Sequence, residues 1–128
     1  MKPITQTYEV KATSVEVFKA LTNSEIIKKW SGGPAQMDNK VGTKFSLFGG
    51  GVHGTNLEVI PNQKLVQEWY AEEWKQPSRV SFTLVPAGES TIIELLHEGV
   101  PEDEIQKFSE GWNQHYLGQI QKMFEETP

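Results

Sequence analysis

A glycine-rich stretch is the first place in this sequence where chemistry could be sought. Residues 45–54 read FSLFGGGVHG, which holds four of the chain's 11 glycines and one histidine. A phosphate-binding loop of the Walker type needs a lysine and a serine or threonine directly after its last glycine, and a helix must follow. Here Gly54 is followed by TNLEVI, which has a strand-like pattern. We therefore predict that the three consecutive glycines turn one strand into the next and that Gly54 accommodates a β-bulge.

The histidines are the next candidates for acid–base or metal chemistry. They are His53, His97 and His115; no two are four residues apart, and none belongs to a carboxylate cluster with zinc spacing. The strand-like alternation of Ile93, Leu95 and His97 puts these three on one face, which we expect to point inward. His97 is then either a buried histidine with satisfied hydrogen bonds or a polar contact at one end of a pocket. We expect no metal site and no cofactor.

Residues for covalent or paired-carboxylate catalysis are not recognisable. No serine lies in a nucleophile-elbow pattern, and Glu68 and Glu94 stand in the middle of expected strands, facing solvent. The sequence therefore favours a protein that is not an enzyme. The alternative is a cyclase or hydratase that uses His97 or His115 as its acid–base group, and it requires one of these side chains inside a cavity.

Aromatic side chains are the remaining candidates for function. The chain has 4 Trp, 3 Tyr and 6 Phe. Such rings either fill a core or form the walls of a pocket for an apolar or flat ligand, and one ring can do both. We expect one set of side chains to point between a sheet and a helix and to bind a ligand there, with His97 as its polar member. The set is Trp30, Phe45, Trp69, Phe82, His97, Trp112 and Tyr116.

The N-terminal elements that must position these rings are one strand and two short helices. Residues 4–11 alternate loosely, as a strand does. The letters TSVE at 13–16 have the spacing of a capping box and precede an apolar helical face. A second short helix starts at NSE, residues 23–25, carries Trp30, and ends at SGGP, residues 31–34.

Short strand-like runs separated by turn signals occupy the middle of the chain. No helical pattern interrupts them, so the runs predict an antiparallel meander of about six strands. One short run contains Met37, and the others span residues 43–48, 52–60, 64–71, 78–85 and 90–97.

The last segment predicts one long amphipathic helix. Pro101 stands at the first helical position, and the acidic residues EDE follow it. Apolar residues then recur every three or four positions over about six turns. Gly111 and Gly118 interrupt this face, each at a cost of about 1 kcal/mol relative to alanine. Either they allow close approach to another backbone or they leave a space. The expected face is Ile105, Phe108, Trp112, Tyr116, Ile120, Met123 and Phe124.

These elements predict an α+β fold in which one long helix covers a curved antiparallel sheet of about seven strands. We expect residues 1–128 to form a single domain with a pocket left between sheet and helix. A net charge of −5 with Arg79 as the lone arginine argues against a nucleic-acid partner. The chain has no cysteine, no apolar run of membrane-spanning length and no signal-peptide pattern, so a cytoplasmic location is the default expectation.

Four segments resemble the heat-shock protein 90 ATPase activator homologue family. VEVFKALTNSEIIKKWSGG is similar to its helical entry and FSLFGGGVHGTNLEVIPNQKLVQEWYAEEW to its middle strands. SRVSFTLVPAGESTIIELLHEGVP is similar to its last hairpin and GWNQHYLGQIQKMF to its C-terminal helix. Together these segments span almost the whole chain.

The resemblance implies a helix-grip fold of the START-like (SRPBCC) superfamily, with a cavity between sheet and helix. In the eukaryotic co-chaperone such a domain forms the C-terminal half, contacts the chaperone's N-terminal domains and helps to stimulate ATP hydrolysis. Two functions follow as expectations. The first is a non-enzymatic domain that binds a small hydrophobic ligand in the cavity. The second is a co-chaperone-like protein that binds a heat-shock protein 90 homologue and modulates its ATPase.

Overall fold

One antiparallel sheet with helices packed on one of its faces makes up the fold. The structure, a computed structural model, describes residues 3–71 and 75–125. The seven strands of the sheet follow the order β1-β7-β6-β5-β4-β3-β2, and every neighbouring pair is antiparallel. The predicted α+β helix-grip fold is therefore confirmed. The strands are β1 (Ile4–Val10), β2 (Ala35–Gln36), β3 (Lys44–Leu47), β4 (Val52–Ile60), β5 (Lys64–Ala71), β6 (Ser78–Ala87) and β7 (Ser90–Glu98).

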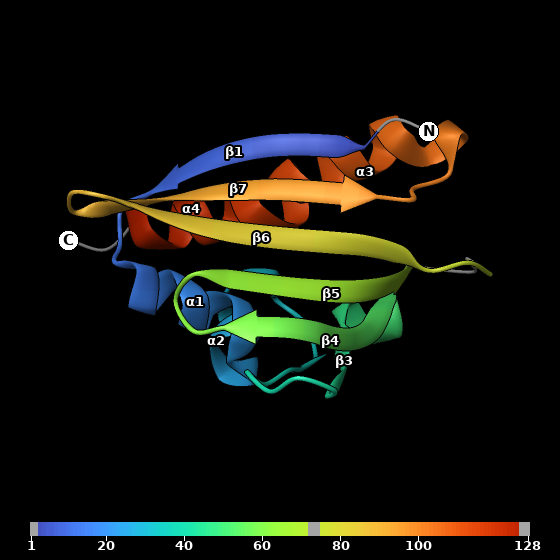
Figure 1. The fold of residues 1–128 in the computed structure, drawn as a ribbon, viewed down its shortest axis with the longest axis horizontal. Coiled ribbons are helices and arrows are strands. Elements are labelled where there is room, and N and C mark those ends of the chain that lie inside the picture. The colour runs from blue at the N-terminus through green and yellow to red at the C-terminus, as the bar shows by residue number, and fades with distance from the viewer. Residues whose placement is uncertain (1–2, 72–74, 126–128) are drawn as a thin grey trace.

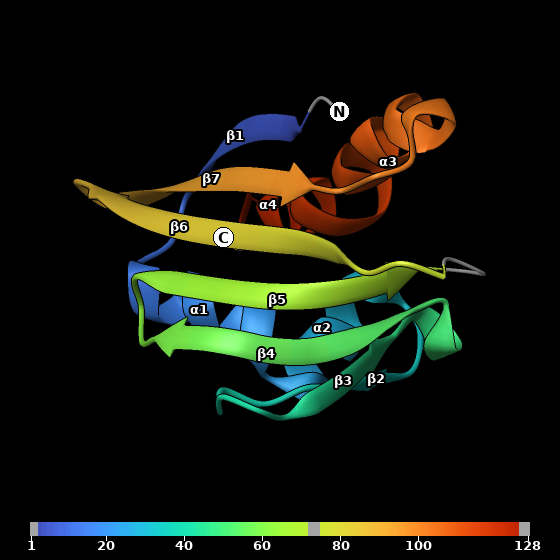
Figure 2. The same cartoon turned by 45° about the vertical axis from the view of Figure 1, so that its right-hand side comes forward.

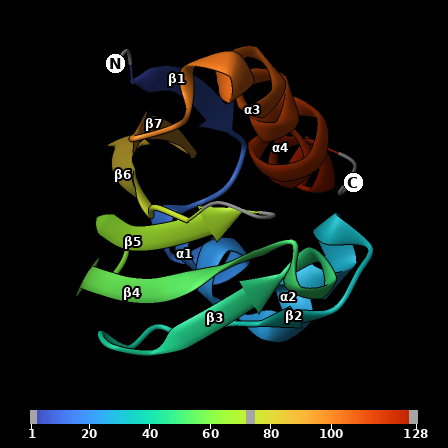
Figure 3. The same ribbon diagram turned by 90° about the vertical axis from the view of Figure 1, so that its right-hand side faces the viewer.

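Two groups of helices cover different halves of the sheet. The first group is α1 (Ser14–Thr22) and α2 (Ser24–Ser31), which lie behind β4 and β5 (Figure 1, Figure 2). The second group is the C-terminal segment with α3 (Ile105–Gly111) and α4 (Leu117–Glu125), which lies behind β1 and β7 in Figure 1 and beside them in the side view of Figure 3. Side chains from both groups meet the inward face of the sheet in one core.

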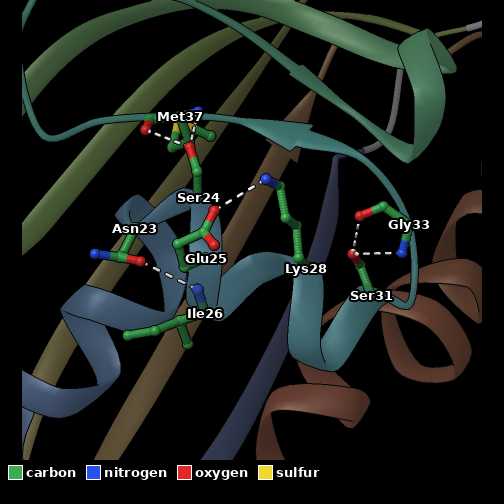
Figure 4. A network of polar contacts seen from close by, with 8 residues as sticks. All are labelled: Asn23, Ser24, Glu25, Ile26, Lys28, Ser31, Gly33 and Met37. Atoms are coloured by element: carbon green, nitrogen blue, oxygen red, sulfur yellow. Dashed lines mark hydrogen bonds and ion pairs between the residues drawn. The ribbon is translucent and has the colours of Figure 1, made fainter.

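The caps predicted for the first two helices are present. Thr13 and Glu16 form the capping box of α1, with the Glu16 N–H donating to the Thr13 hydroxyl. The Asn23 side chain accepts from the Ile26 N–H at 3.1 Å and caps α2. Figure 4 shows this cap.

The end of α2 and its attachment to the sheet side also follow from local chemistry. The helix ends at Gly32, which is left-handed with φ of 73°. The Ser24 hydroxyl both donates to the Met37 carbonyl and accepts from the Met37 N–H, each at 2.8 Å (Figure 4). These two bonds tie the start of α2 to the segment that follows β2. Met37 therefore lies just outside the strand in which it was predicted, since β2 ends at Gln36.

The C-terminal segment differs from the predicted single α-helix at its centre. It begins with the 3₁₀ turn η2 (Glu102–Glu104) and continues as α3. A π-helical turn, η3 (Trp112–Tyr116), then separates α3 from α4. A Cβ atom on Gly118 would overlap the carbonyl oxygen of Asn113, so glycine is required for the backbone to approach this closely. At Gly111 a Cβ atom would meet nothing within 4 Å. The expected close approach to another backbone is therefore not found, because Gly118 is crowded by its own segment, whereas Gly111 leaves open space.

The glycine-rich stretch forms a turn, as predicted. This turn determines the position of Phe48. The 3₁₀ turn η1 (Phe48–Gly50) joins β3 to β4, and Gly49 and Gly50 have φ of 66° and 97°. The bulge expected at Gly54 is wrong, because the register of β4 and β5 shifts between Asn56 and Glu58 instead. Gly54 permits close strand packing: a Cβ atom there would overlap the Glu68 carbonyl oxygen.

The two outer strands of the sheet are each protected. On one side β2 is only two residues long. On the other side, the Gln121 amide donates to the Glu9 carbonyl of β1 at 2.9 Å. The Gln6 amide of β1 also donates to the Ser109 carbonyl at 2.8 Å, so β1 is fastened to the C-terminal segment at two points. Within residues 3–71 and 75–125, no helix has the length and apolar character needed to cross a membrane.

Candidate functional site

A groove of about 420 Å³ lies between the C-terminal segment and the connection from β3 to β4. The groove joins parts of the chain that are far apart in sequence, because α3 and η3 form one wall and η1, the start of β4 and the end of β5 form the other. Its volume falls in the range of small-molecule sites. The lining residues are Phe48, Val52, Trp69, Lys107, Phe108, Glu110, Gly111, Trp112, Gln114, His115 and Tyr116.

The floor of the groove is a cluster of rings in direct contact. Trp69 and Trp112 stack with ring centroids 4.9 Å apart and planes inclined by 25°. The Tyr116 ring lies 4.7 Å from Trp112 and 4.8 Å from Trp30. Trp69, Trp112 and Tyr116 are each only 2% exposed. These rings fill the space between sheet and helix, so the hollow is an open groove at the rim of the ring cluster, with exposed side chains on its outer edge.

The Tyr116 hydroxyl is the exceptional polar group of this floor. It is buried, and among the described residues it has no hydrogen-bond partner. Burial raises the pKa of the Tyr116 phenol, which therefore remains protonated over the physiological range. A neutral phenol can both donate and accept a hydrogen bond.

Phe48 separates the groove from a second hollow. Its ring stands edge-on to Trp30 and Tyr116, with centroid distances of 6.5 Å and 6.1 Å. Its φ is 55°, in the left-handed region that is unfavourable for a bulky residue. The second hollow has a volume of about 340 Å³ and is lined by Lys29, Trp30, Ser31, Gly32, Phe48, Gln114, His115 and Gln119.

His97 lies behind the floor in a chain of hydrogen bonds. It is fully buried, and its Nδ1 accepts from the Trp112 indole N–H at 3.1 Å. An indole N–H only donates, so Nδ1 carries no proton and the proton of the neutral ring is on Nε2. Nε2 then donates to the Ser78 hydroxyl at 2.8 Å, and that hydroxyl donates to the Trp69 carbonyl at 3.3 Å. Burial lowers the pKa of His97 to about 4, in agreement with a neutral ring.

A second set of buried hydrogen bonds holds Trp69. Its indole N–H donates to the Gln67 side-chain oxygen at 2.9 Å. The Gln67 amide in turn donates to the Asn56 side-chain oxygen at 3.0 Å. Asn56 donates to the carbonyls of Asp38 and Lys40. Both tryptophans of the floor are therefore fixed by their indole nitrogens, which leaves their ring faces for apolar contact.

The outer edge of the groove is polar and carries charges of both signs. Lys107, Glu110, Gln114 and His115 lie there and are exposed. The described part of the chain contains no group of three or more His, Cys, Asp or Glu side chains that could hold a metal ion. The groove offers apolar contact on its floor, one buried hydroxyl, and no strong selection for either sign of charge.

The structure brings only part of the predicted ligand-binding set to one surface. Trp69, Trp112 and Tyr116 line the groove, and Trp30 lines the second hollow. Phe45, Phe82 and His97 line neither one. Phe82 is fully buried and packs against Trp112 and Tyr116, His97 lies behind Trp112, and Phe45 packs near Gly54. An acid–base role would therefore have to use His115, because both ring nitrogens of His97 are already engaged within the core.

Several lining residues were not foreseen from the sequence. The sequence predicts Phe48 at a strand end, Val52 at a strand start and Phe108 on the apolar face of the helix, and it assigns none of them to a site. For Phe48 a signal existed, because a large aromatic residue directly before three glycines is poorly placed to be buried in a strand. The exposed positions Lys107, Glu110 and Gln114 gave no signal, since polar residues on the outside of a helix are ordinary.

Comparison with known proteins identifies one family, and curated relatives that match the chain carry the name of the same family. The sequence profile of the family described as "Activator of Hsp90 ATPase homolog 1-like protein" matches residues 11–125. The activator of 90 kDa heat shock protein ATPase homolog from Dictyostelium discoideum is 30% identical over 130 residues, which cover 96% of this chain and 34% of that protein. Human activator of 90 kDa heat shock protein ATPase homolog 1 is 25% identical and is matched over 33% of its length. The chain thus spans about a third of these curated relatives.

Solved structures with the same fold cover nearly all of the chain. An HSP90 activator from Plasmodium falciparum superposes with a TM-score of 0.90 at 26% identity, over 98% of this chain and 97% of that one. CalU16 from Micromonospora echinospora gives a TM-score of 0.85 at 26% identity, over 98% and 76% of the two chains.

Proposed function

Because the chain belongs to the family of activator of Hsp90 ATPase homolog 1-like proteins, we propose that it is a non-enzymatic binding domain whose groove receives an apolar small molecule. The observation that carries this proposal is the exposed hollow of about 420 Å³ over three rings that are otherwise buried. Trp69, Trp112 and Tyr116 form the floor of the groove, and the partly exposed Phe48 forms its side wall. We further propose a cytoplasmic location for this activity.

The arrangement favours binding over chemistry. His97 is neutral and engaged on both nitrogens, so it has no proton-transfer role at the groove. The hydrogen-bonded indoles hold the floor rigid, which lowers the entropic cost of ordering a bound ligand. A rigid apolar floor with a polar edge is the usual composition of a small-molecule site.

Filling the groove tests the proposal directly. Gly111 lines the groove, has helical φ and ψ of −61° and −38°, and has free space around its Cβ position. Gly111→Leu should therefore fold normally and occupy the hollow. We expect the wild-type protein to bind naphthalene, detected by shifts of the Trp69 and Trp112 indole N–H signals in NMR spectra, and Gly111→Leu to abolish binding.

A matched variant shows whether a loss of naphthalene binding comes from filling the groove or from adding a leucine anywhere on this helix. Gln106 is exposed on the same helix and does not line the groove. Gln106→Leu should bind naphthalene as the wild type does. If naphthalene bound equally well to Gly111→Leu, or did not bind the wild type up to its solubility limit, the proposed groove function would be wrong.

A co-chaperone-like role is the second candidate. It is supported by the near-complete superposition on a protein described as an HSP90 activator, at 26% identity. In this role the chain would bind a heat-shock protein 90 homologue and change its ATPase rate. Co-purification with the purified chaperone, combined with an ATPase assay, tests it. Absence of binding at tens of micromolar would exclude this role and would leave the groove proposal unaffected.

A further inference from the structure

We propose that the groove selects uncharged planar molecules that carry a hydroxyl or carbonyl oxygen, and that the Tyr116 hydroxyl recognises this oxygen. The inference rests on the proposed function, since it names the chemical class of the ligand for the same groove. It adds a polar recognition group to a site that is otherwise defined by apolar contact.

The first argument is the unsatisfied hydroxyl itself. Tyr116 is 2% exposed, and its hydroxyl has no partner among the described residues, although the other buried polar groups nearby are paired. A buried hydroxyl without a partner is unfavourable, and such groups are rare in folded proteins. Phenylalanine would make the same ring contacts without this penalty. Tyr116 lines the groove but its hydroxyl is covered, so the tyrosine is explained if a ligand that enters the groove displaces the covering side chains and supplies the missing partner.

The second argument is the shape and charge of the surroundings. Trp112 and Tyr116 lie side by side with their planes inclined by 53°, and Trp69 stacks on Trp112. Ring surfaces of this kind favour flat apolar ligands. Lys107 and Glu110 place opposite charges on the outer edge of the groove, so neither an anionic nor a cationic ligand is favoured. The ligand that fits these features is planar, uncharged and oxygen-bearing.

The π-helical turn strengthens the assignment because it places Tyr116 and much of one groove wall in the same structural irregularity. Gly111 and the η3 residues Trp112, Gln114, His115 and Tyr116 line the groove. π-Helical turns inside α-helices occur frequently at functional sites. Here the turn requires glycine at position 118, so the sequence preserves the irregularity at the expense of helix propensity.

The test compares two probes that differ by one oxygen, 1-naphthol and naphthalene, on the full chain. We expect the ratio of the naphthalene dissociation constant to the 1-naphthol dissociation constant to fall by roughly three- to tenfold when Tyr116 is replaced by phenylalanine. This is the range for one net hydrogen bond. Naphthalene has no oxygen, so its dissociation constant in each variant reports changes in the ring contacts alone and serves as the reference. Tyr8→Phe is the matched control, because its hydroxyl donates to Gln6 at 2.6 Å and Tyr8 does not line the groove.

Each outcome of this test is decisive. A ratio that falls in Tyr116→Phe and stays at the wild-type value in Tyr8→Phe supports the inference. An unchanged ratio in Tyr116→Phe, with both probes still bound, overturns the inference and leaves the groove function standing. A ratio that falls equally in both variants also overturns it, because the effect would not come from the groove. Binding of neither probe to the wild type removes both proposals.

Discussion

The indole N–H of Trp112 donates to Nδ1 of His97 over 3.1 Å and thereby fixes the tautomer of a fully buried histidine. Because the proton is then on Nε2, the ring can donate onward to the Ser78 hydroxyl of β6. One hydrogen-bonded chain thus links the C-terminal segment to β7, β6 and the end of β5. The bond has consequences for stability, for protonation and for the geometry of the groove floor.

Stability should depend on pH through His97. The pKa of this ring is lowered from 6.5 to about 4 in the folded protein, because burial disfavours its charged form. Between these values the unfolded chain binds more protons, so the free energy of unfolding falls as pH decreases from about 6.5 to about 4. The free energy of unfolding should fall by about 3 kcal/mol over this range. Above about pH 7.5 His97 should have no effect on the pH dependence, because the ring is neutral in both the folded and the unfolded chain. Urea unfolding at intervals of pH measures it.

Two variants isolate this contribution. His97→Gln should be less stable at neutral pH, yet its stability should depend less on pH between 4 and 6.5 than that of the wild type. His115→Gln, at an exposed histidine, is the matched control. Identical pH profiles for the wild type and His97→Gln would contradict the burial of a neutral imidazole.

The Trp112 hydrogen bond should also determine the tautomer that NMR detects. In the wild type we expect nitrogen shifts of an imidazole protonated at Nε2 alone. Trp112→Phe removes the donor to Nδ1, so both tautomers should become populated. The variant should lose at least about 2 kcal/mol of stability, since it leaves a smaller ring in the core and an unsatisfied buried nitrogen. An Nδ1-protonated ring in the wild type would contradict the assigned direction of the bonds.

Removing the two tyrosine hydroxyls should have different effects on stability. Tyr116→Phe removes a buried hydroxyl that has no partner among the described residues, so we expect unchanged or increased stability. Tyr8→Phe removes a hydroxyl that is bonded to Gln6, and we expect a loss of about 1 kcal/mol. Thermal unfolding of the two variants in the absence of ligand checks this difference. A large destabilisation by Tyr116→Phe would show that the hydroxyl has a structural role.

The two glycines of the C-terminal segment provide a matched pair. Gly118→Ala places a methyl group against the Asn113 carbonyl and should destabilise the protein by about 2 kcal/mol or more, as overpacking does. Gly111→Ala places the same group in open space and should stabilise the protein by up to about 1 kcal/mol through helix propensity. Equal effects at both positions, measured by urea unfolding, would contradict the role of Gly118 in the π-helical turn.

The left-handed backbone of Phe48 makes a further comparison informative. Phe48→Ala and Phe48→Gly remove the same ring contacts with Trp30 and Tyr116. They differ in that alanine must still adopt φ of 55°, whereas glycine does so without penalty. We expect the glycine variant to be the more stable of the two by about 1 kcal/mol. The reverse order would place the backbone outside the left-handed region.

Local signals in the sequence were sufficient to predict most elements of the fold. The spacing of Thr13 and Glu16 defined the start of α1, and the bounds of β4 and β5 follow the turn at Pro61. The inward position of His97 followed from the two-residue period of its strand. These features depend on residues close together in the chain, where backbone preferences and side-chain caps decide the structure.

The π-helical turn does not follow from apolar periodicity alone, although the sequence contains a signal for it. Phe108, Trp112, Tyr116 and Ile120 follow at exact intervals of four residues. On an α-helix each such step drifts by about 40°, so four such residues cannot all remain on one narrow face. A wider turn compensates for the drift and keeps Trp112 and Tyr116 directed at the sheet.

The groove itself was beyond local reasoning. Phe48 and Gly111 line it from opposite sides, and they come together although the sheet order puts β3 and β4 far from β1, to which the C-terminal segment is bonded. The unpaired hydroxyl of Tyr116 likewise depends on how rings from several elements meet. The sequence could indicate that the interior was rich in aromatic residues, but not which of them would reach its surface.

The fastening of β1 to the C-terminal segment restricts how this domain can recruit other chains. The Glu9 carbonyl of β1 already accepts from Gln121, and β2 is only two residues long, so an added strand would meet one occupied acceptor on β1 or a very short template at β2. An incoming peptide could not readily join the sheet as an eighth strand. Recognition of side chains on its faces is therefore favoured over strand addition, and replacing Gln121 would free the Glu9 carbonyl for pairing with another chain.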